Sequence, residues 1–163
     1  FFGTNLPGAT NSVYTRTAVK PSQAGDYSVV VTNNYGAVTS AVATLTVNYK
    51  PGIATQPLSQ TVFGGNNATF SVVASGVPAP AYQWRFNGTN IAGANASSLA
   101  LISVQATNAG GYTVVVTNTL GSVTSSVATL TVVFPPAIAS QPQSQTVVSG
   151  SNVNFSEIGR AHV

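Results

Sequence analysis

The chain has 163 residues, of which only 4% are charged, and five basic and two acidic residues give it a formal net charge of +3. Nucleic-acid-binding proteins typically neutralise about 6–10 phosphates, so these few dispersed basic residues exclude a nucleic-acid partner. Apolar runs are far shorter than the roughly 18 residues that a membrane span requires, and no membrane insertion is expected within the chain.

An internal repeat with an offset of 85 residues organises the chain. Residues 1–5 and 86–90 are identical at four of five positions, and more than half of the positions in 1–49 are identical at this offset. Units that recur at a fixed period are typical of tandem arrays. We therefore expect the chain to be a fragment at both ends. Residues 1–49 are the C-terminal part of one repeat, 50–134 a complete repeat, and 135–156 the N-terminal part of a third.

The last seven residues, 157–163, break the repeat abruptly. One reverse translation of this segment resembles a common short-read sequencing adapter. We interpret the segment as a sequencing-adapter artefact and exclude it from fold reasoning; a divergent third repeat is the alternative. The interpretation matters because the segment holds His162, the only histidine, and Glu157, the only glutamate.

Short apolar segments alternate with turn sequences in the complete repeat. In chain order, strands are expected near residues 53–56, 58–63, 68–74, 82–86, 99–101, 112–116 and 123–132. Prolines at 51 and 135 mark the borders of the repeat, because proline cannot continue a central ladder. Short strands at a spacing of about 8–12 residues, with no helical periodicity, predict a β-sandwich.

The last strand of the repeat changes its apolar face partway along. Val123 and Val127 share one parity, whereas Leu130 and Val132 share the other. A strand that faces one core cannot change parity without an extra residue, so we predict a bulge near Ala128. The first unit has the same pattern.

Three segments, residues 70–76, 82–84 and 109–114, resemble strands B, C and F of an immunoglobulin-like domain, closest to the I-set pattern. In that family a Trp on strand C packs against a disulfide between strands B and F, and a Tyr two residues before the second Cys forms a tyrosine corner. The resemblance implies an all-β fold: an immunoglobulin-like antiparallel β-sandwich in tandem repeats.

The resemblance also assigns structural core roles in the complete and first units. The residues are Trp84 as the strand C tryptophan, Tyr112 and Tyr27 at the two corners, and Val72, Val114 and Val29 at cysteine positions. The repeats are therefore disulfide-free. Burial of each valine side chain stabilises the fold by about 1.5–3 kcal/mol, which offsets part of the stability lost with the disulfide. Residues 14–16 depart from the pattern of strand E, which we expect to be shifted or partly exposed in the first unit.

Catalysis requires groups that exchange protons or attack. Outside the last seven residues the sequence has no His, Cys or Glu, and one acidic residue, Asp26. A single carboxylate forms neither a carboxylate pair nor a calcium site, and capping a turn is the favoured role for Asp26. We predict a protein that is not an enzyme, with no catalytic, metal-binding or cofactor-binding residues.

Two other sets of residues are candidates for contact with a ligand. Tyr82, Trp84 and Phe86 share a strand face and could stack on sugars if exposed, but strand parity places Trp84 in the core. Tyr35 and Leu120 lie at the tips of the last hairpins of their units. They are the candidate contact residues because loop tips often carry recognition; a merely solvated tip is the alternative.

The resemblance extends to function. Repeats of this kind are similar to those of large secreted or surface proteins of environmental bacteria. The resemblance implies a non-enzymatic structural or adhesive module, such as a spacer or stalk, located outside the cell or on its surface. Its partners would be neighbouring immunoglobulin-like repeats and protein or glycan ligands. The alternative is an accessory carbohydrate-binding module of a secreted hydrolase.

The linkers and the incomplete units give two further expectations. Prolines stiffen both linkers, and aromatic rings at the equivalent positions Tyr49 and Phe134 could wedge between domains, so the array should be a semi-rigid rod. The incomplete units lack strands, and we expect them to fray or to pair with each other.

Overall fold

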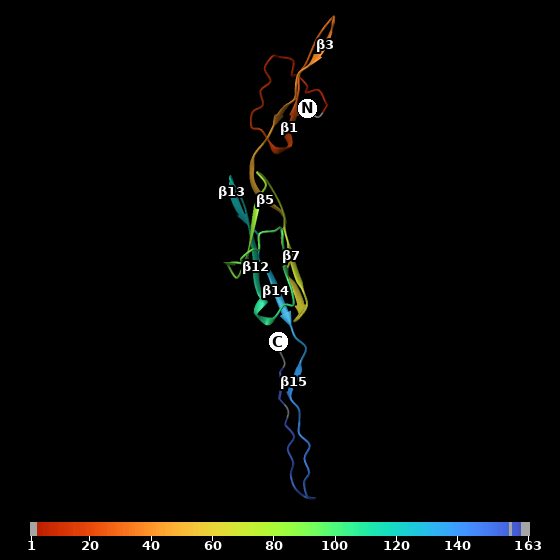
Figure 1. Ribbon diagram of the computed structural model, residues 1–163, viewed down its shortest axis with the longest axis vertical. Coiled ribbons are helices and arrows are strands. Elements are labelled where there is room, and N and C mark those ends of the chain that lie inside the picture. Colours follow the sequence, from red (N-terminus) through yellow and green to blue (C-terminus); the bar gives the residue numbers. More distant parts are fainter. Residues whose placement is uncertain (1–2, 157, 161–163) are drawn as a thin grey trace.

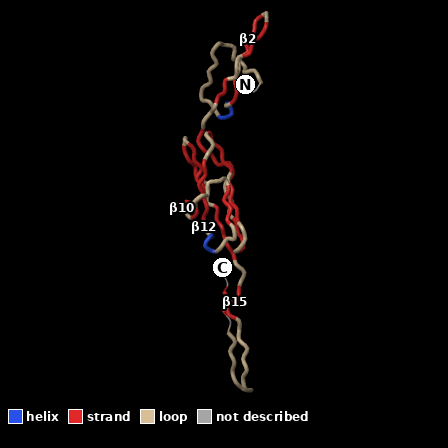
Figure 2. The backbone as a smooth tube through the Cα atoms, in the orientation of Figure 1, coloured by secondary structure: helices blue, strands red, loops and turns tan. Residues whose placement is uncertain are grey.

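The computed structural model describes residues 3–156 and 158–160. The molecule is elongated, with the complete repeat in the middle and one incomplete unit toward each end (Figure 1). Strands and loops make up nearly all of it, with two short 3-10 turns (Figure 2). Because the two incomplete units lie at opposite ends, the expectation that they could pair with each other is wrong.

Strands follow one another along all three units, with one 3-10 turn in each of the first two. The first unit contains η1 (Pro21–Gln23), β1 (Gly25–Tyr27), β2 (Val30–Asn33), β3 (Gly36–Thr39) and β4 (Ala43–Leu45). The complete repeat contains β5 (Tyr49–Thr55), β6 (Gln60–Phe63), β7 (Ala68–Ser71), β8 (Val73–Val77), β9 (Ala81–Phe86), β10 (Thr89–Asn90), β11 (Ser98–Leu101), η2 (Ala106–Asn108), β12 (Gly110–Asn118), β13 (Gly121–Thr124) and β14 (Ala128–Val133). The last unit contains β15 (Ala137–Ser140) and β16 (Ile158–Arg160).

Two layers form the complete repeat. One sheet has the order β10-β9-β12-β14-β6, with β13 also paired to β12. Its pairs are antiparallel except for β14 and β6, which are parallel. In the other layer β5 pairs with β8 and β7 with β11. Strands β7 and β8 are interrupted only at Val72, whose N–H donates to Ser97 O at 3.0 Å. The predicted all-β, immunoglobulin-like sandwich is confirmed.

Aromatic side chains from both layers meet in the core. The Phe70 ring stacks on Tyr112 with centroids 4.7 Å apart, and Trp84 lies 6.2 Å from Phe70. Trp84 and Val114 have no exposed surface, and Val72 is 4% exposed. The buried cluster as a whole is Ala68, Phe70, Val72, Trp84, Leu99, Val104, Tyr112, Val114, Val116, Ala128 and Leu130. Strands β7 and β12 and the first part of β14 bury alternate residues, as expected for a sheet with one wet face.

The bulge in the last strand is confirmed. Thr124 pairs with Val115, whereas Ala128 pairs with Tyr112. The register therefore gains one residue between β13 and β14, in the segment 125–127 that lies in neither strand. This extra residue moves Ala128 and Leu130 onto the buried face, where they are 0% and 1% exposed.

The first unit keeps its local pairings but has no core around them. Strand β1 pairs with β4 and β2 with β3, yet Val29 is 54% exposed. The assignment of Val29 to a core is therefore wrong for this chain, because no opposing sheet covers these ribbons in the described residues. Tyr27 is half-buried. Residues 14–16 form no strand, and the Arg16 guanidinium lies 5.5 Å from the centre of the Tyr14 ring.

The last unit forms an extended ribbon. Strand β15 pairs antiparallel with β16, whose residues belong to the segment interpreted as an adapter artefact. The rest of that segment, Glu157 and residues 161–163, lies outside the described residues.

Candidate functional site

The acidic residue of the first unit serves a structural bond. Asp26 Oδ1 accepts a hydrogen bond from Thr44 Oγ1 at 2.7 Å and so ties β1 to β4. In the described part of the chain, no three His, Cys, Asp or Glu side chains gather where they could hold a metal ion. The described helical turns contain no segment long and apolar enough to cross a bilayer.

Trp84 is not available to a ligand. It is fully buried, and its Nε1–H donates to Ala96 O at 3.0 Å. The bond satisfies the only polar atom of the indole, as burial of a Trp requires. Tyr82 and Phe86, on the same strand, are half-buried and pack against the core. This strand face therefore offers no exposed aromatic platform.

The tyrosine corner is present in both units. Tyr112 OH donates to Asn108 O at 2.8 Å, and Tyr27 OH donates to Gln23 O at 2.7 Å. Each bond joins the strand that carries the tyrosine, β12 or β1, to the 3-10 turn before it. Burial raises the pKa of the Tyr112 hydroxyl above its ordinary value.

The two hairpin tips have the same construction. Asn33 Oδ1 accepts from Tyr35 N at 2.8 Å, and Asn118 Oδ1 accepts from Leu120 N at 2.9 Å. Such local side-chain bonds are what make Asn favourable in turns. The turns project Tyr35 and Leu120 outward, where they are 98% and 51% exposed.

Asn118 also fastens the start of β5, where the chain enters the complete repeat. Its Nδ2 donates to Tyr49 O at 2.9 Å and to Pro78 O at 3.0 Å. One amide therefore joins the β12–β13 hairpin, the start of β5 and the loop after β8. The sequence pattern did not single out Asn118, although its recurrence as Asn33 at the repeat offset was a usable signal.

The opposite end of the repeat is closed by Phe134. Its ring lies directly on Gly64, so closely that a Cβ atom at Gly64 would collide with it. Beside the ring, Gly64 N donates to Val133 O at 2.9 Å. Phe134 thus packs on a turn of its own unit, and this contact fixes the direction in which the chain leaves the domain.

Comparison with known proteins identifies the family of this domain. Residues 50–118 match the family model described as immunoglobulin domain. Roundabout homolog 1 of Mus musculus is 34% identical over 144 residues, which are 85% of this chain and 9% of that protein. Endoglucanase C of Cellulomonas fimi is 40% identical over 86 residues, which are 50% of this chain and 8% of that protein. The chain thus spans under a tenth of the length of either relative.

A solved structure shows the same fold. The I-band fragment I67-I69 from titin has a TM-score of 0.62 and 21% identity, and the match covers 88% of this chain and 54% of that one.

Proposed function

We propose, from the premise that the chain contains an immunoglobulin-like domain, that it is a stretch of a non-enzymatic spacer or stalk in a large secreted or surface protein of a bacterium. Repeats bounded at residues 50 and 134 would follow one another in that protein, and each would dock on its neighbours. Exposed hairpin tips such as Tyr35 and Leu120 would be free to touch protein or glycan ligands.

The observation that carries this proposal is the Asn118 contact with the start of β5, where the chain enters the domain. A spacer must hold its distal end away from a surface, which requires that its linkers resist bending. The two donated bonds to Tyr49 O and Pro78 O hold the first residue of β5 where the chain enters the domain, and Phe134 on Gly64 holds the segment by which it leaves. Neither linker has the Gly/Ser composition of a flexible tether.

Replacement of Asn118 by Asp provides a sharp test. Asp keeps the oxygen that accepts from Leu120 N, but it cannot donate to Tyr49 O or Pro78 O. In three complete repeats joined in tandem, we expect solution scattering from the unchanged protein to fit a semi-rigid rod. The Asn118→Asp protein should give a shorter and broader distribution of distances. Thr119→Ala, in the same hairpin but exposed, is the matched control.

Two results would count against the spacer as it is argued from Asn118. Scattering that requires freely jointed domains in the unchanged protein would remove its physical basis. An Asn118→Asp protein as rigid as the control would show that the linker is held by other contacts.

A second candidate is an accessory module beside a catalytic domain of a secreted hydrolase. The similarity to Endoglucanase C favours it, because half of this chain is 40% identical to a segment of that protein. Sedimentation of the chain with insoluble cellulose tests it directly. Retention on cellulose that is lost in Tyr35→Ala or Leu120→Ala would favour the accessory module over the spacer.

A further inference from the structure

The last unit has the strand pairing with which a complete repeat begins. Strand β15 pairs with β16 in the register of β5 with β8, shifted by 85 residues. Ile138 lies opposite Gly159, as Ile53 lies opposite Ala74, and the register irregularity that follows recurs as well. The ribbon is therefore the first part of a sandwich, already in its own register.

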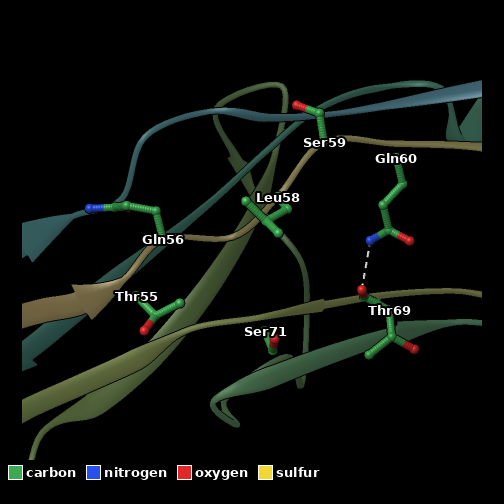
Figure 3. Close-up of a pocket in the computed structure, with 7 residues that line it drawn as sticks. All are labelled: Thr55, Gln56, Leu58, Ser59, Gln60, Thr69 and Ser71. Carbon is green, nitrogen blue, oxygen red and sulfur yellow. Dashed lines mark hydrogen bonds between the residues drawn. The ribbon is translucent and has the colours of Figure 1, made fainter.

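A side-chain bond of the complete repeat also recurs in this ribbon. Gln60 Nε2 donates to Thr69 O at 2.6 Å and so joins β6 to β7 (Figure 3). The residues 85 positions further on make the same bond, in which Gln145 Nε2 donates to Asn154 O at 2.6 Å. Because the described residues place no second sheet around the last unit, the ribbon takes this shape without the rest of a domain.

The first unit is the other part of a repeat, and it keeps its register too. Strand β4 pairs with β1, and β3 with β2, as β14 and β13 pair with β12, shifted by 85 residues. Tyr27 lies opposite Ala43, as Tyr112 lies opposite Ala128. The two incomplete units are thus different parts of the same sandwich, each formed separately.

Each of these parts exposes side chains that the complete repeat buries. Phe155 is 63% exposed, whereas Phe70, its equivalent at the repeat offset, is 1% exposed. Val31 is 61% exposed, whereas its equivalent Val116 has no exposed surface. In the complete repeat the two faces meet, because Phe70 stacks on Tyr112 of the opposite sheet. The apolar face of the last unit is therefore shaped for the apolar face of the first.

The strand edges that would join the two parts are open in the described residues. Strand β4 has β1 as its one strand partner there, and residues 145–148 lie in no strand. In the complete repeat the same edges are joined by the parallel ladder of β6 with β14, and by Ser59 Oγ, which accepts from Thr129 N at 2.9 Å. The sequence keeps this acceptor and donor as Ser144 and Thr44.

We propose that the last unit of one copy of the chain docks on the first unit of a second copy. The two units of a single molecule lie at its opposite ends (Figure 1), so the partner is another molecule. Residues 145–148 would pair in parallel with residues 45–48, as β6 pairs with β14, and Phe155 would lie on Tyr27. Such pairing adds a strand to an open edge through main-chain hydrogen bonds.

The contact is head-to-tail, so it would join copies into open chains. Neither unit supplies an equivalent of Trp84, and the docked core is smaller than that of the complete repeat. The association should therefore be weaker than the fold of a complete repeat and should depend on concentration. This inference does not rest on the spacer function.

Disulfide cross-linking tests the register, because the chain has no cysteine. Thr61 lies opposite Thr131 in the parallel ladder, so Thr146 of one copy should lie opposite Thr46 of the next. A mixture of the Thr46→Cys and Thr146→Cys proteins is oxidised, and mass spectrometry of tryptic peptides shows which residues are joined. In the control mixture Thr39→Cys replaces Thr46→Cys. Thr39 is also exposed in the first unit, but it lies on β3, away from the proposed ladder.

Sedimentation of the full chain over a concentration series measures the association itself. Phe155→Asp places a charge where docking would bury it, which is costly. Val148→Asp is the matched control, because its equivalent Phe63 stays 59% exposed in the complete repeat. Both side chains are exposed in the single chain, so neither change removes a contact from its own core. Trp84 fluorescence checks that the complete repeat is intact.

We expect the average mass of the unchanged chain to rise with concentration, the Val148→Asp protein to follow it, and the Phe155→Asp protein to remain monomeric. The disulfide between residues 46 and 146 should exceed the half share that random pairing gives, and the control mixture should not. Three results would overturn the proposal: no association of the unchanged chain, equal association of the two Asp proteins, or cross-linking of residue 39 to residue 146 as readily as of residue 46.

Discussion

Ser125 and Val114 are joined by two hydrogen bonds across the bulge of the complete repeat. Ser125 N donates to Val114 O at 2.9 Å, and Val114 N donates to Ser125 Oγ at 3.0 Å. The hydroxyl replaces the backbone acceptor that the bulge has moved away. In the first unit, Ser40 and Val29 make the same two contacts, at 2.9 and 3.1 Å.

Ser125→Ala should therefore lower the stability of the domain more than Ser126→Ala does. The substitution leaves the fully buried Val114 with an unpaired N–H, which typically costs about 1–3 kcal/mol. Urea unfolding followed by Trp84 fluorescence measures the loss. Ser126→Ala is the matched control, because Ser126 is exposed. Equal losses in the two proteins would contradict this role for the hydroxyl.

The two valines at the expected cysteine positions offer a second prediction. Val72 and Val114 lie in the same buried cluster, one in each layer. We expect Val72→Cys together with Val114→Cys to form a disulfide on oxidation and to gain about 2–4 kcal/mol of stability over the reduced form. Mass spectrometry and unfolding with and without reductant check this. Failure to form the disulfide would show that Val72 and Val114 do not occupy the positions of the two cysteines of strands B and F.

Alkaline pH should weaken the fold through Tyr112. Burial raises the pKa of its hydroxyl above the ordinary value of about 10, so the unfolded chain loses its proton first. Stability is therefore level below about pH 10 and falls as the pH rises above it. The unfolding free energy of Tyr112→Phe should fall less steeply over that range, although this protein starts lower because it lacks the bond to Asn108 O. If the unfolding free energies of the two proteins fell equally steeply with pH, Tyr112 would not be the cause of the loss.

Gly64→Ala should displace the Phe134 ring. The added methyl group would occupy the space of the ring, and such overpacking typically costs about 1–3 kcal/mol. The backbone of Gly64 does not itself require glycine, because it does not have a left-handed φ. In a Phe134→Ala background the same substitution should cost little. A double-mutant cycle measures this coupling, and additive losses would mean that the two residues act separately.

Much of the sandwich could be predicted because its strands alternate regularly. The parity change between Val127 and Leu130 located the bulge, since one buried face leaves no other explanation. The tyrosine corner predicted for Tyr112 is present, and its hydroxyl donates to Asn108 O. In the strand predicted near residues 99–101, Leu99 takes the deeper position, at 8% exposed, and Leu101 is half-buried.

The rest depended on contacts that local patterns do not encode. Val104 has no exposed surface, yet it lies between β11 and η2, where no periodicity marks it. Asn118 reaches Tyr49 across 69 residues of sequence. Strand β5 also runs through Pro51, past the expected border, because it is an edge strand with an irregular register there.

The parallel pairing of β6 with β14 has a mechanical consequence for a chain built of such domains. The polypeptide enters the complete domain at one end and leaves it at the other (Figure 1). Tension along the chain would pull on β14 in its own direction while the rest of the domain holds β6 back. The bonds from Leu130 to Val133 along this ladder would then bear load in shear, all at once, instead of opening singly from one end. A chain of such domains would therefore resist stretching along its own length through this ladder.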